Sequence, residues 1–505
     1  MEPRRVSVCA LGLKNDEIDE LAADAVVWAT QHGLVMGAKS GGTAPDLAGS
    51  GVQITTVHAP VSLSPVALPR REYERALALS GVISSLMDAV SRDRAYLRET
   101  LEVAAQEDPF TGDLLKLMND IEAEVGPERM VDPVTLLMTR SDYMLDEPST
   151  RMLQVEINMI AASFASLSTL VSRLHRYLAL RHPGILAGDA DANNLPENEP
   201  LAGFADAMGE AVRRYCAHKG WEAPRPGASS APDAPIVLMV VQPGERNAFD
   251  QQWIASTLWE RHGVRTVRKL FKEVAAEAQV GSDGTLTLGG RRVALAYLRA
   301  GYTPADFVTE SDWQGRRVLE VSDAPKVPNL AQQLAGTKKV QQDLARPGVL
   351  ERFLSDQDAG GLRAVFAGQW SFEEFDGAEA RGVIAKALEN PDAYVLKPQR
   401  EGGGNNLYGE DAAKVLRAGG RKLGAYILME RIRPPVNKTL FLREGVWAEG
   451  DSLSEVGVYG AYVRVGSDAP AVNCAAGTLI RTKLESSNEG GVAAGFAVLD
   501  SPRLT

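Results

Sequence analysis

The stretch 396-LKPQREGGGNNLYG-409 places two cations, one carboxylate, three consecutive glycines and two asparagines close together. A strand ending at Lys397 would deliver an ammonium group to a loop whose glycines let backbone N–H groups approach a ligand. Such a loop suits phosphate. Glu401 would repel a phosphate unless a cation lay between them, and a hard oxygen ligand beside phosphate oxygens is what Mg²⁺ requires. The stretch therefore indicates a phosphate and Mg²⁺ site, with a glycine-rich surface turn as the alternative.

A second candidate for metal binding is the segment 153-LQVEINM-159, which alternates apolar and polar residues. This period predicts a strand with Gln154, Glu156 and Asn158 on one face and the apolar residues, Val155 among them, on the other. Glu156 and Asn158 would lie about 6 to 7 Å apart, close enough to share one or two metal ions. Read alone, the segment is more typical of an amphipathic strand with a solvated polar face. Convergence with Glu401 is what would make it a metal site.

Three further cations stand beside small or polar residues. Lys338, in 335-AGTKKVQQ-342, begins a predicted helix, where the macrodipole disfavours a cation unless solvent or an anion holds it. Arg481 and Lys483 alternate on a predicted strand and would share one face. The loop 490-GGVAAG-495 follows them and could close over a ligand. A solvated lysine and an ordinary hairpin connection are the alternatives.

Composition bounds the class of protein. The chain has 505 residues, 45% of them hydrophobic and 24% charged, which suits two or three globular domains. A net charge of −12 gives no general attraction for nucleic acid or an anionic membrane, so a local cluster of cations must hold any anionic ligand. Cys9, Cys216 and Cys474 are too few and too far apart for a disulfide framework or a zinc site.

Other familiar chemistries have no sequence signal. The six histidines show no metal-ligand spacing, and we find no Ser or Cys nucleophile motif, Walker A pattern or dinucleotide fingerprint. No run approaches the roughly 20 apolar residues of a membrane span. A cytoplasmic protein is expected, with an organellar precursor form left open.

Periodicity predicts an α/β fold of alternating helices and strands. A helix capped by Asn15 or Asp16 ends near Gly33, and helical spacing runs again from Glu72 into the 120s. The proline-rich segment 222–235 predicts a domain boundary. The expected elements after it are strands at 236–241, 264–267 and 293–298 around a helix at 247–262, then a polar break at 355–361 and strands at 394–397 and 426–430.

These pieces, in this order, resemble the eukaryotic-type glutathione synthetases. The resemblance begins near Leu13 and runs to the C-terminus. It is carried by 140-RSDYM-144, 154-QVEIN-158, 245-ERNAFDQ-251, 299-RAGY-302, 335-AGTKKVQQ-342, 394-YVLKPQREGGGNNLYG-409, 426-YILMERI-432, 454-SEVGVYG-460, 481-RTK-483 and 490-GGVAAGFAVLD-500. Plant-type members are the most similar, judging by 58-HAP-60, 171-VSRLH-175 and 348-GVLERFL-354.

The resemblance implies an ATP-grasp ligase, usually a homodimer, that joins γ-glutamylcysteine to glycine with ATP and two Mg²⁺ ions. Its intermediate would be an acyl phosphate, and positioning and charge neutralisation would do most of the catalysis. The implied ATP-grasp fold is discontinuous: residues 1–225 form its first part with N-terminal helices, 236–337 an inserted α/β substrate-binding domain, and 338–505 its second part with a lid, a glycine-rich loop (402–406) and an alanine-rich loop (490–495).

The resemblance also implies roles for individual residues. Mg²⁺ would be ligated by Glu156, Asn158 and Glu401. The nucleotide would be bound by Lys338, Lys397, Glu401, Gly402, Gly403, Asn406, Tyr408, Met429, Glu430, Ile432, Glu455 and Lys483, with Met429, Glu430 and Ile432 at the adenine and Glu455 at the ribose. The peptide substrates would be bound by Arg140, Ser163, Glu245, Asn247, Gln251, Arg299, Tyr302, Arg481, Val492 and Ala493. The residues expected to act in catalysis are Arg481, Glu401 and Arg140.

One position departs from the family pattern, and three alternatives stay open. Ala161 stands where relatives commonly carry a serine or another small polar residue, which puts one hydrogen bond to the dipeptide in doubt. A homoglutathione synthetase would use β-alanine, and one methylene is worth only about 1 to 3 kcal/mol of discrimination, although Ala493 and Ala494 favour glycine. A noncatalytic nucleotide-binding protein would have lost a metal ligand or Arg481. A phosphotransferase acting on a hydroxyl would need a base, for which no candidate is visible.

Overall fold

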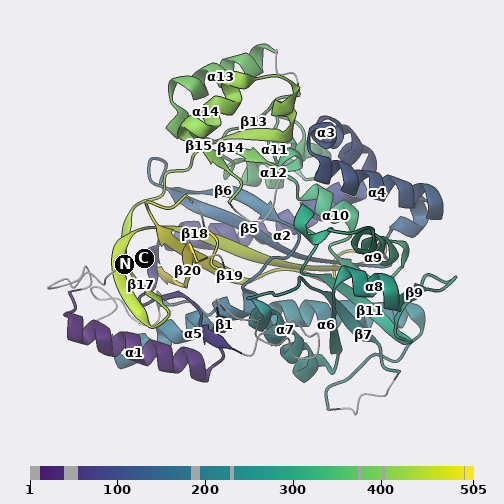
Figure 1. Cartoon of the computed structure of the whole chain (residues 1–505), viewed down its shortest axis with the longest axis horizontal. Coiled ribbons are helices and arrows are strands. Elements are labelled where there is room, and N and C mark those ends of the chain that lie inside the picture. The colour runs from purple at the N-terminus through teal and green to yellow at the C-terminus, as the bar shows by residue number, and fades with distance from the viewer. Residues whose placement is uncertain are drawn as a thin grey trace.

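The computed structural model describes residues 12–38, 55–183, 194–227, 233–373, 377–399, 404–488, 490–493 and 495–505. It has a mixed α/β architecture, with a long central sheet between helices, a small lobe above it and a third sheet to one side (Figure 1). None of the described helices combines the length and apolarity needed to cross a bilayer.

The central sheet has seven strands and draws on both ends of the chain. Its pairings are antiparallel except for the parallel contact between β20 and β3. The strand order is β17 (Asn437–Arg443), β3 (Val61–Ser62), β20 (Ala497–Asp500), β19 (Val472–Leu484), β18 (Val446–Val465), β5 (Val134–Asp146) and β6 (Arg151–Asn158).

Helices cover the two faces of this sheet, as the alternation of β18 shows. Tyr459 points to one face and packs edge-on against Phe204 of α6 (Pro200–Lys219), beside α5 (Ala165–Arg181). Tyr462 and Arg464 point to the other face, where both bind Asp88 of α2 (Arg70–Arg92). The sheet therefore lies between α2 and the α5–α6 pair.

The predicted N-terminal helices are confirmed, but the predicted cap is wrong, because Lys14 precedes the first helix and Asn15 and Asp16 lie within it. In α1 (Asn15–Gln31) the residues at helical spacing are buried, and Gly33, with φ of 71°, follows its end. The helical stretch from Glu72 consists of α2, α3 (Arg94–Glu107) and α4 (Pro109–Val125). Asp93 and Asp108 separate them, because each aspartate caps the next helix by accepting a backbone N–H at 2.9 Å.

The third sheet confirms the predicted parallel α/β unit. Strand β7 (Ile236–Val240) pairs in parallel with β8 (Arg265–Lys269) and β11 (Arg291–Leu298), and α7 (Ala248–His262) connects β7 to β8. The other members are β10 (Leu286–Leu288), β9 (Ala278–Val280) and β12 (Lys326–Val327), with α8 (Phe271–Glu277) and α9 (Glu310–Val321) alongside.

The small lobe at the top of Figure 1 is an antiparallel sheet covered by two helices, α13 (Ala378–Glu389) and α14 (Gly409–Ala418). Its strands are β13 (Gln369–Ser371), β16 (Tyr426–Glu430), β14 (Tyr394–Pro398) and β15 (Leu407–Tyr408). Strands β14 and β16 lie where the sequence predicted them. The remaining elements are α10 (Leu330–Ala335), α11 (Lys338–Leu344) and the two-stranded pairs β1 (Val35–Gly37) with β2 (Thr56–His58) and β4 (Val66–Leu68) with β21 (Pro502–Leu504).

The predicted polar break at 355–361 is wrong, because this segment belongs to α12 (Asp356–Arg363). Ser355 caps the helix by accepting the N–H of Asp358 at 3.2 Å, and the aspartates of the first turn suit the positive end of the helix dipole. Ala359 and Leu362 are buried at helical spacing. The polar residues that suggested a break are thus the start of a helix.

Candidate functional site

A cavity of about 670 Å³ lies between the central sheet and the small lobe. Its walls come from β5, β6, β18 and β19 below, β14 and β16 above, and the segments 160–164 and 490–493. The predicted site residues that line it are Arg140, Glu156, Asn158, Ser163, Tyr302, Lys397, Asn406, Tyr408, Met429, Glu430, Ile432, Glu455, Arg481, Lys483, Val492 and Ala493. Glu401, Gly402, Gly403 and Ala494 lie outside the described residues.

A β-bulge shapes the floor of the cavity. The ladder between β5 and β6 shifts register next to Glu156, and Val155 is the extra residue. Consequently Val155, Glu156 and Asn158 all line the cavity, whereas Gln154 is buried and donates to Ser141 Oγ at 2.7 Å. The predicted placement of Val155 opposite Glu156 is therefore wrong, since a bulge interrupts the period of two.

Asp142 is the charged centre beneath the floor. Its fully buried carboxylate accepts bonds from Arg140 Nε at 2.6 Å and Nη2 at 2.8 Å, from Asn158 Nδ2 at 2.9 Å and from Arg481 Nη2 at 3.0 Å. Arg481 also pairs with Glu455. Asn158 donates a second bond to the Arg140 carbonyl at 3.2 Å, so its amide oxygen is the atom left for the cavity. Asp142 thus holds two guanidinium groups and orients one amide.

Sequence reasoning missed this role of Asp142. The available signal was its position two residues after Arg140 on one predicted strand, which places both side chains on the same face. Three of its four hydrogen bonds come from Arg140, two residues away, or from Asn158 on the neighbouring strand. The fourth comes from Arg481, which is 339 residues away in the sequence. Such a partner is set by strand order and not by any local pattern.

Cations gather around Glu156. Lys338 Nζ lies 3.4 Å from its carboxylate, and buried Lys397 is close by. Burial by itself would raise the pKa of Glu156, but Lys338, Lys397 and the two arginines together lower it to about 2. Burial lowers the pKa of Lys397 to about 8, although Glu156 opposes this shift. Four cations around one carboxylate leave this end of the cavity suited to a polyanion.

Glu455 has a different environment from Glu156. Burial raises the pKa of Glu455, and the nearby charges of Asp142 and Glu156 add to the effect, while Arg481 opposes it. For Arg481, burial acts to lower the pKa, yet Glu455 and Asp142 raise it overall, so the guanidinium stays charged. Glu455 is a suitable acceptor for hydroxyl groups beside the cations.

An apolar slot adjoins the charged floor. Ala367, Val395, Met429 and Ile432 are buried together there, with Met144, Leu153, Val155 and Tyr408 packed against them, and all of these except Ala367 and Leu153 line the cavity. The Arg431 guanidinium lies 5.5 Å from the centre of the Tyr408 ring. A flat, apolar ligand group could lie in this slot while an attached anionic group reached the cations.

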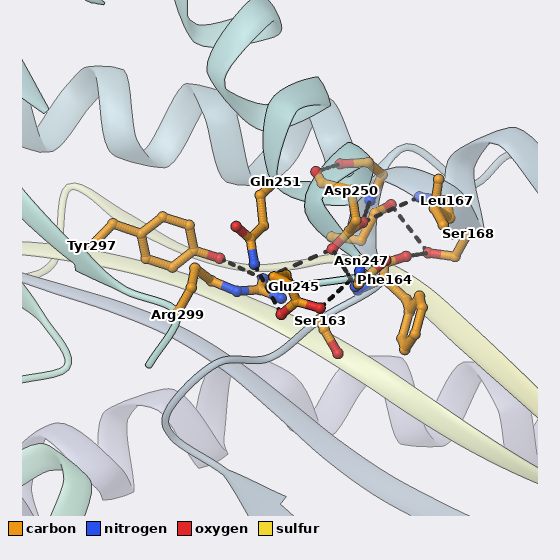
Figure 2. A network of polar contacts seen from close by, with 12 residues as sticks. Ser163, Phe164, Leu167, Ser168, Glu245, Asn247, Asp250, Gln251, Tyr297 and Arg299 are labelled. Carbon is orange, nitrogen blue, oxygen red and sulfur yellow. Dashed lines mark hydrogen bonds and ion pairs between the residues drawn. The ribbon is translucent and has the colours of Figure 1, made fainter. Parts of the chain in front are cut away.

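The predicted substrate residues from the third sheet form a separate polar network (Figure 2). Glu245 Oε1 accepts the backbone N–H of Asn247 at 2.7 Å, and Glu245 Oε2 accepts Gln251 Nε2 at 3.3 Å. Arg299 donates to the Tyr297 hydroxyl at 3.0 Å. Asn247 Oδ1 and Arg299 Nε are buried and have no hydrogen-bond partner among the described residues. One is an acceptor and the other a donor, which suits a zwitterionic ligand.

Asp250 connects this network to the cavity, and sequence reasoning missed it as well. Its fully buried carboxylate lies 3.8 Å from Arg299 and accepts the backbone N–H groups of Phe164 at 2.8 Å and Ser166 at 2.9 Å. These bonds fix the start of α5 and place Ser163 beside the network (Figure 2). Lys338, Glu245, Asn247, Gln251 and Arg299 do not themselves line the cavity. Lys338 pairs with Glu156, which does, and the other four lie in the network beside Ser163 (Figure 2).

Comparisons with known proteins agree with this site. The family model described as "Eukaryotic glutathione synthase, ATP binding domain" matches residues 15–504. A chloroplastic glutathione synthetase of Solanum lycopersicum is 41% identical over 96% of this chain and 84% of its own length. A chloroplastic glutathione synthetase of Arabidopsis thaliana is 42% identical over 97% and 86%, and the Homo sapiens glutathione synthetase is 37% identical over 96% and 97%.

A solved structure shares the fold. It is a glutathione synthetase-like effector from Globodera pallida in its apo form, with a TM-score of 0.73 and 21% identity over 99% of both chains.

Proposed function

The chain belongs to the eukaryotic glutathione synthase family and is a glutathione synthetase, an ATP-dependent ligase, and we propose how its residues carry out that reaction. The observation that carries this proposal is the gathering of four cations, Lys338, Lys397, Arg140 and Arg481, near Glu156, next to an apolar slot. This arrangement suits a nucleoside triphosphate with its base in the slot and its phosphates at the cations. Lys338 and Lys397 would contact the phosphates, and Glu455 the ribose.

The donor set fits Mg²⁺. Glu156 is ionised over the whole neutral range, and Asp142 holds the Asn158 amide with its oxygen toward the cavity. With Glu401, these residues would hold Mg²⁺, which would neutralise charge on the ATP phosphates.

The dipeptide would lie at the other end of the cavity. Glu245 would receive its α-ammonium group, Arg299 and Arg140 would bind carboxylates, and Asn247 would supply the free acceptor. Ser163 and Tyr302 line the cavity between this network and the floor. Ala161 offers no side-chain hydrogen bond there.

In the proposed reaction, the cysteinyl carboxylate of γ-glutamylcysteine attacks the γ-phosphorus of ATP. ADP leaves and an acyl phosphate forms. The glycine amine then attacks the carbonyl carbon, phosphate leaves, and the nitrogen loses a proton as the amide forms. Arg481, fixed by Asp142 and Glu455, would stabilise the negative charge that develops at the reacting carboxylate.

The test is acceptor-dependent turnover by the purified protein with Mg²⁺, ATP and γ-glutamylcysteine. ADP release is measured with glycine, β-alanine or no acceptor, and the product is identified by mass. We expect glycine-dependent ADP release with glutathione as product. Preference for β-alanine would keep the mechanism and overturn the acceptor, and no acceptor-dependent turnover would favour a noncatalytic nucleotide-binding protein.

Domain organisation, assembly and compartment extend the proposal. We propose the discontinuous ATP-grasp arrangement of 1–225 and 338–505 around 236–337, since the central sheet takes strands from both ends of the chain.

A homodimer is expected, which light scattering in solution would test. The relatives named chloroplastic support an organellar location as an alternative to the cytoplasm, and fractionation of the source cells would distinguish them.

A further inference from the structure

Arg246 lies between two predicted substrate residues but points elsewhere. It belongs to the turn between β7 and α7, where Glu245 and Asn247 face the network of Figure 2. The half-buried Arg246 side chain instead donates from Nε to the Gly37 carbonyl at 3.1 Å and from Nη1 to the Ala493 carbonyl at 2.5 Å. One side chain therefore ties together three segments that are distant in the sequence.

The contact with Gly37 makes Arg246 a fixed point. The Arg246 carbonyl accepts the N–H of Gly37 at 2.8 Å, so backbone and side chain both bind the end of β1. Strand β1 and the start of α7 lie side by side (Figure 1). The bonds to Gly37 therefore fix the position of the guanidinium that donates to Ala493.

The segment 490–493 has few other hydrogen bonds outside its own loop, although Val492 is buried in the core and Ala493 packs against it. It carries Val492 and Ala493, which line the cavity, and its remaining hydrogen bonds within the described part of the chain come from residues 495–497 of the same loop. Examples are the bonds from Phe496 N to the Gly491 carbonyl at 2.9 Å and from Gly495 N to the Val492 carbonyl at 3.0 Å. Such bonds shape the loop but do not hold it against the substrate network.

We propose that Arg246 is a positioning residue that holds the segment 490–493 over the cavity and so couples ATP consumption to amide formation. This inference rests on the proposed reaction. An arginine suits the role, because its planar fork can donate to two carbonyl oxygens in different directions, whereas a lysine ammonium has a single centre. The turn that carries Glu245 and Asn247 therefore also carries the side chain that holds the segment 490–493 over the same site.

Loss of the hydrogen bond from Arg246 to the Ala493 carbonyl has a specific chemical consequence. When 490–493 is displaced, water can attack the carbonyl carbon of the acyl phosphate in place of the glycine amine. Phosphate then leaves, the free carboxylate of γ-glutamylcysteine is regenerated, and ATP has been hydrolysed to ADP and phosphate without product. A residue that merely stabilised the fold would lower both products together.

The experiment measures ADP and glutathione separately in R246M and R246K. The wild type should give one ADP per glutathione. In R246M we expect about 3 to 10 ADP per glutathione and a glycine KM raised by a similar factor. Loss of one hydrogen bond changes the ratio of the positioned to the displaced state of 490–493 by about this factor. R246K should be intermediate. Affinity for a nonhydrolysable ATP analogue should stay within about twofold of the wild type in both, because Arg246 does not contact the nucleotide end.

Arg176 provides the matched control. It also donates from a guanidinium to a loop carbonyl, that of Leu195 at 3.0 Å, but not at the cavity. R176M should keep one ADP per glutathione.

Two results would overturn the inference: a ratio of one with an unchanged glycine KM in R246M, or equal uncoupling in R176M. If R246M does not fold, a wild-type ratio and KM in R246K are decisive against it. A wild-type protein that forms no glutathione would overturn the proposed reaction, and this inference with it, before any variant is compared.

Discussion

Replacement of Asp142 by asparagine tests the charged centre of the site. The side chain keeps its shape but loses its charge, and one of its oxygens becomes an NH₂ group. Asp142 Oδ2 accepts three of the four bonds, from Arg140 Nη2, Asn158 and Arg481, and Oδ1 accepts Arg140 Nε. The least damaging amide orientation therefore retains three bonds and faces Arg140 Nε with an N–H group.

The expected loss follows from these four bonds. The lost charge-assisted bond is worth about 2 kcal/mol, and each of the other three weakens by about 0.5 to 1 kcal/mol when its acceptor becomes neutral. The sum is about 3.5 to 5 kcal/mol, within the range for breaking a buried ion pair. Arg481 and the Asn158 amide also lose their fixed positions, and displacements of about 1 Å at reacting groups cost about 10²-fold in rate.

Asp88 is the matched control for this prediction. It too is a buried aspartate that accepts bonds from two nitrogens of one guanidinium, that of Arg464, at 2.9 Å each, but it lies on α2, on the other side of the sheet. Urea unfolding followed by tryptophan fluorescence should find D142N and D88N destabilised by similar amounts. D142N alone should lower kcat/KM for ATP by about 10²-fold. Stability of D142N within about 0.5 kcal/mol of the wild type, or an equal kinetic loss in D88N, would refute the reasoning.

Four other residues give sharp expectations. Because the pKa of Lys397 is about 8 and phosphate favours the ammonium form, ATP affinity should fall as pH rises through 8, by up to about tenfold per unit, with proton uptake on binding; calorimetry should find neither effect in K397R, which stays charged. Turnover should be lost in E156A and in E401A, and full activity in both would contradict the metal assignment. A161S should lower the KM for the dipeptide by up to about tenfold and leave the glycine KM unchanged, and an unchanged dipeptide KM would show that this position does not contact it.

Local pattern in the sequence was sufficient for much of the fold. The apolar and β-branched runs predicted β7, β8 and β11, and the intervening helical spacing predicted α7, because a parallel sheet with crossover helices is what such alternation can bury. The pattern failed at 355–361, where a capped, acidic helix start has the composition of a loop. It also failed at Val155, because a bulge depends on how two strands pair and not on one strand's period.

Apart from the family resemblance, nothing in the sequence predicted that these charged residues cluster at one site. By themselves, Lys338, Glu156 and Arg481 were each more typical of a solvated surface or an ordinary hairpin, since nothing local shows which charges converge.

The sequence therefore determined the elements, the residue types for phosphate and metal chemistry, and the family to which the motifs point. Tertiary structure decided which charges meet. Strand order in the central sheet brings Arg481 to Asp142 across 339 residues, and packing of α7 brings Asp250 to the start of α5 across 84 to 86 residues. The first contact fixes Arg481, one of the cations that lower the pKa of Glu156, and the second sets the position of Ser163. Periodicity reflects the local hydrogen bonding and burial of one element, whereas a buried charge takes its state from partners that only the assembled fold supplies.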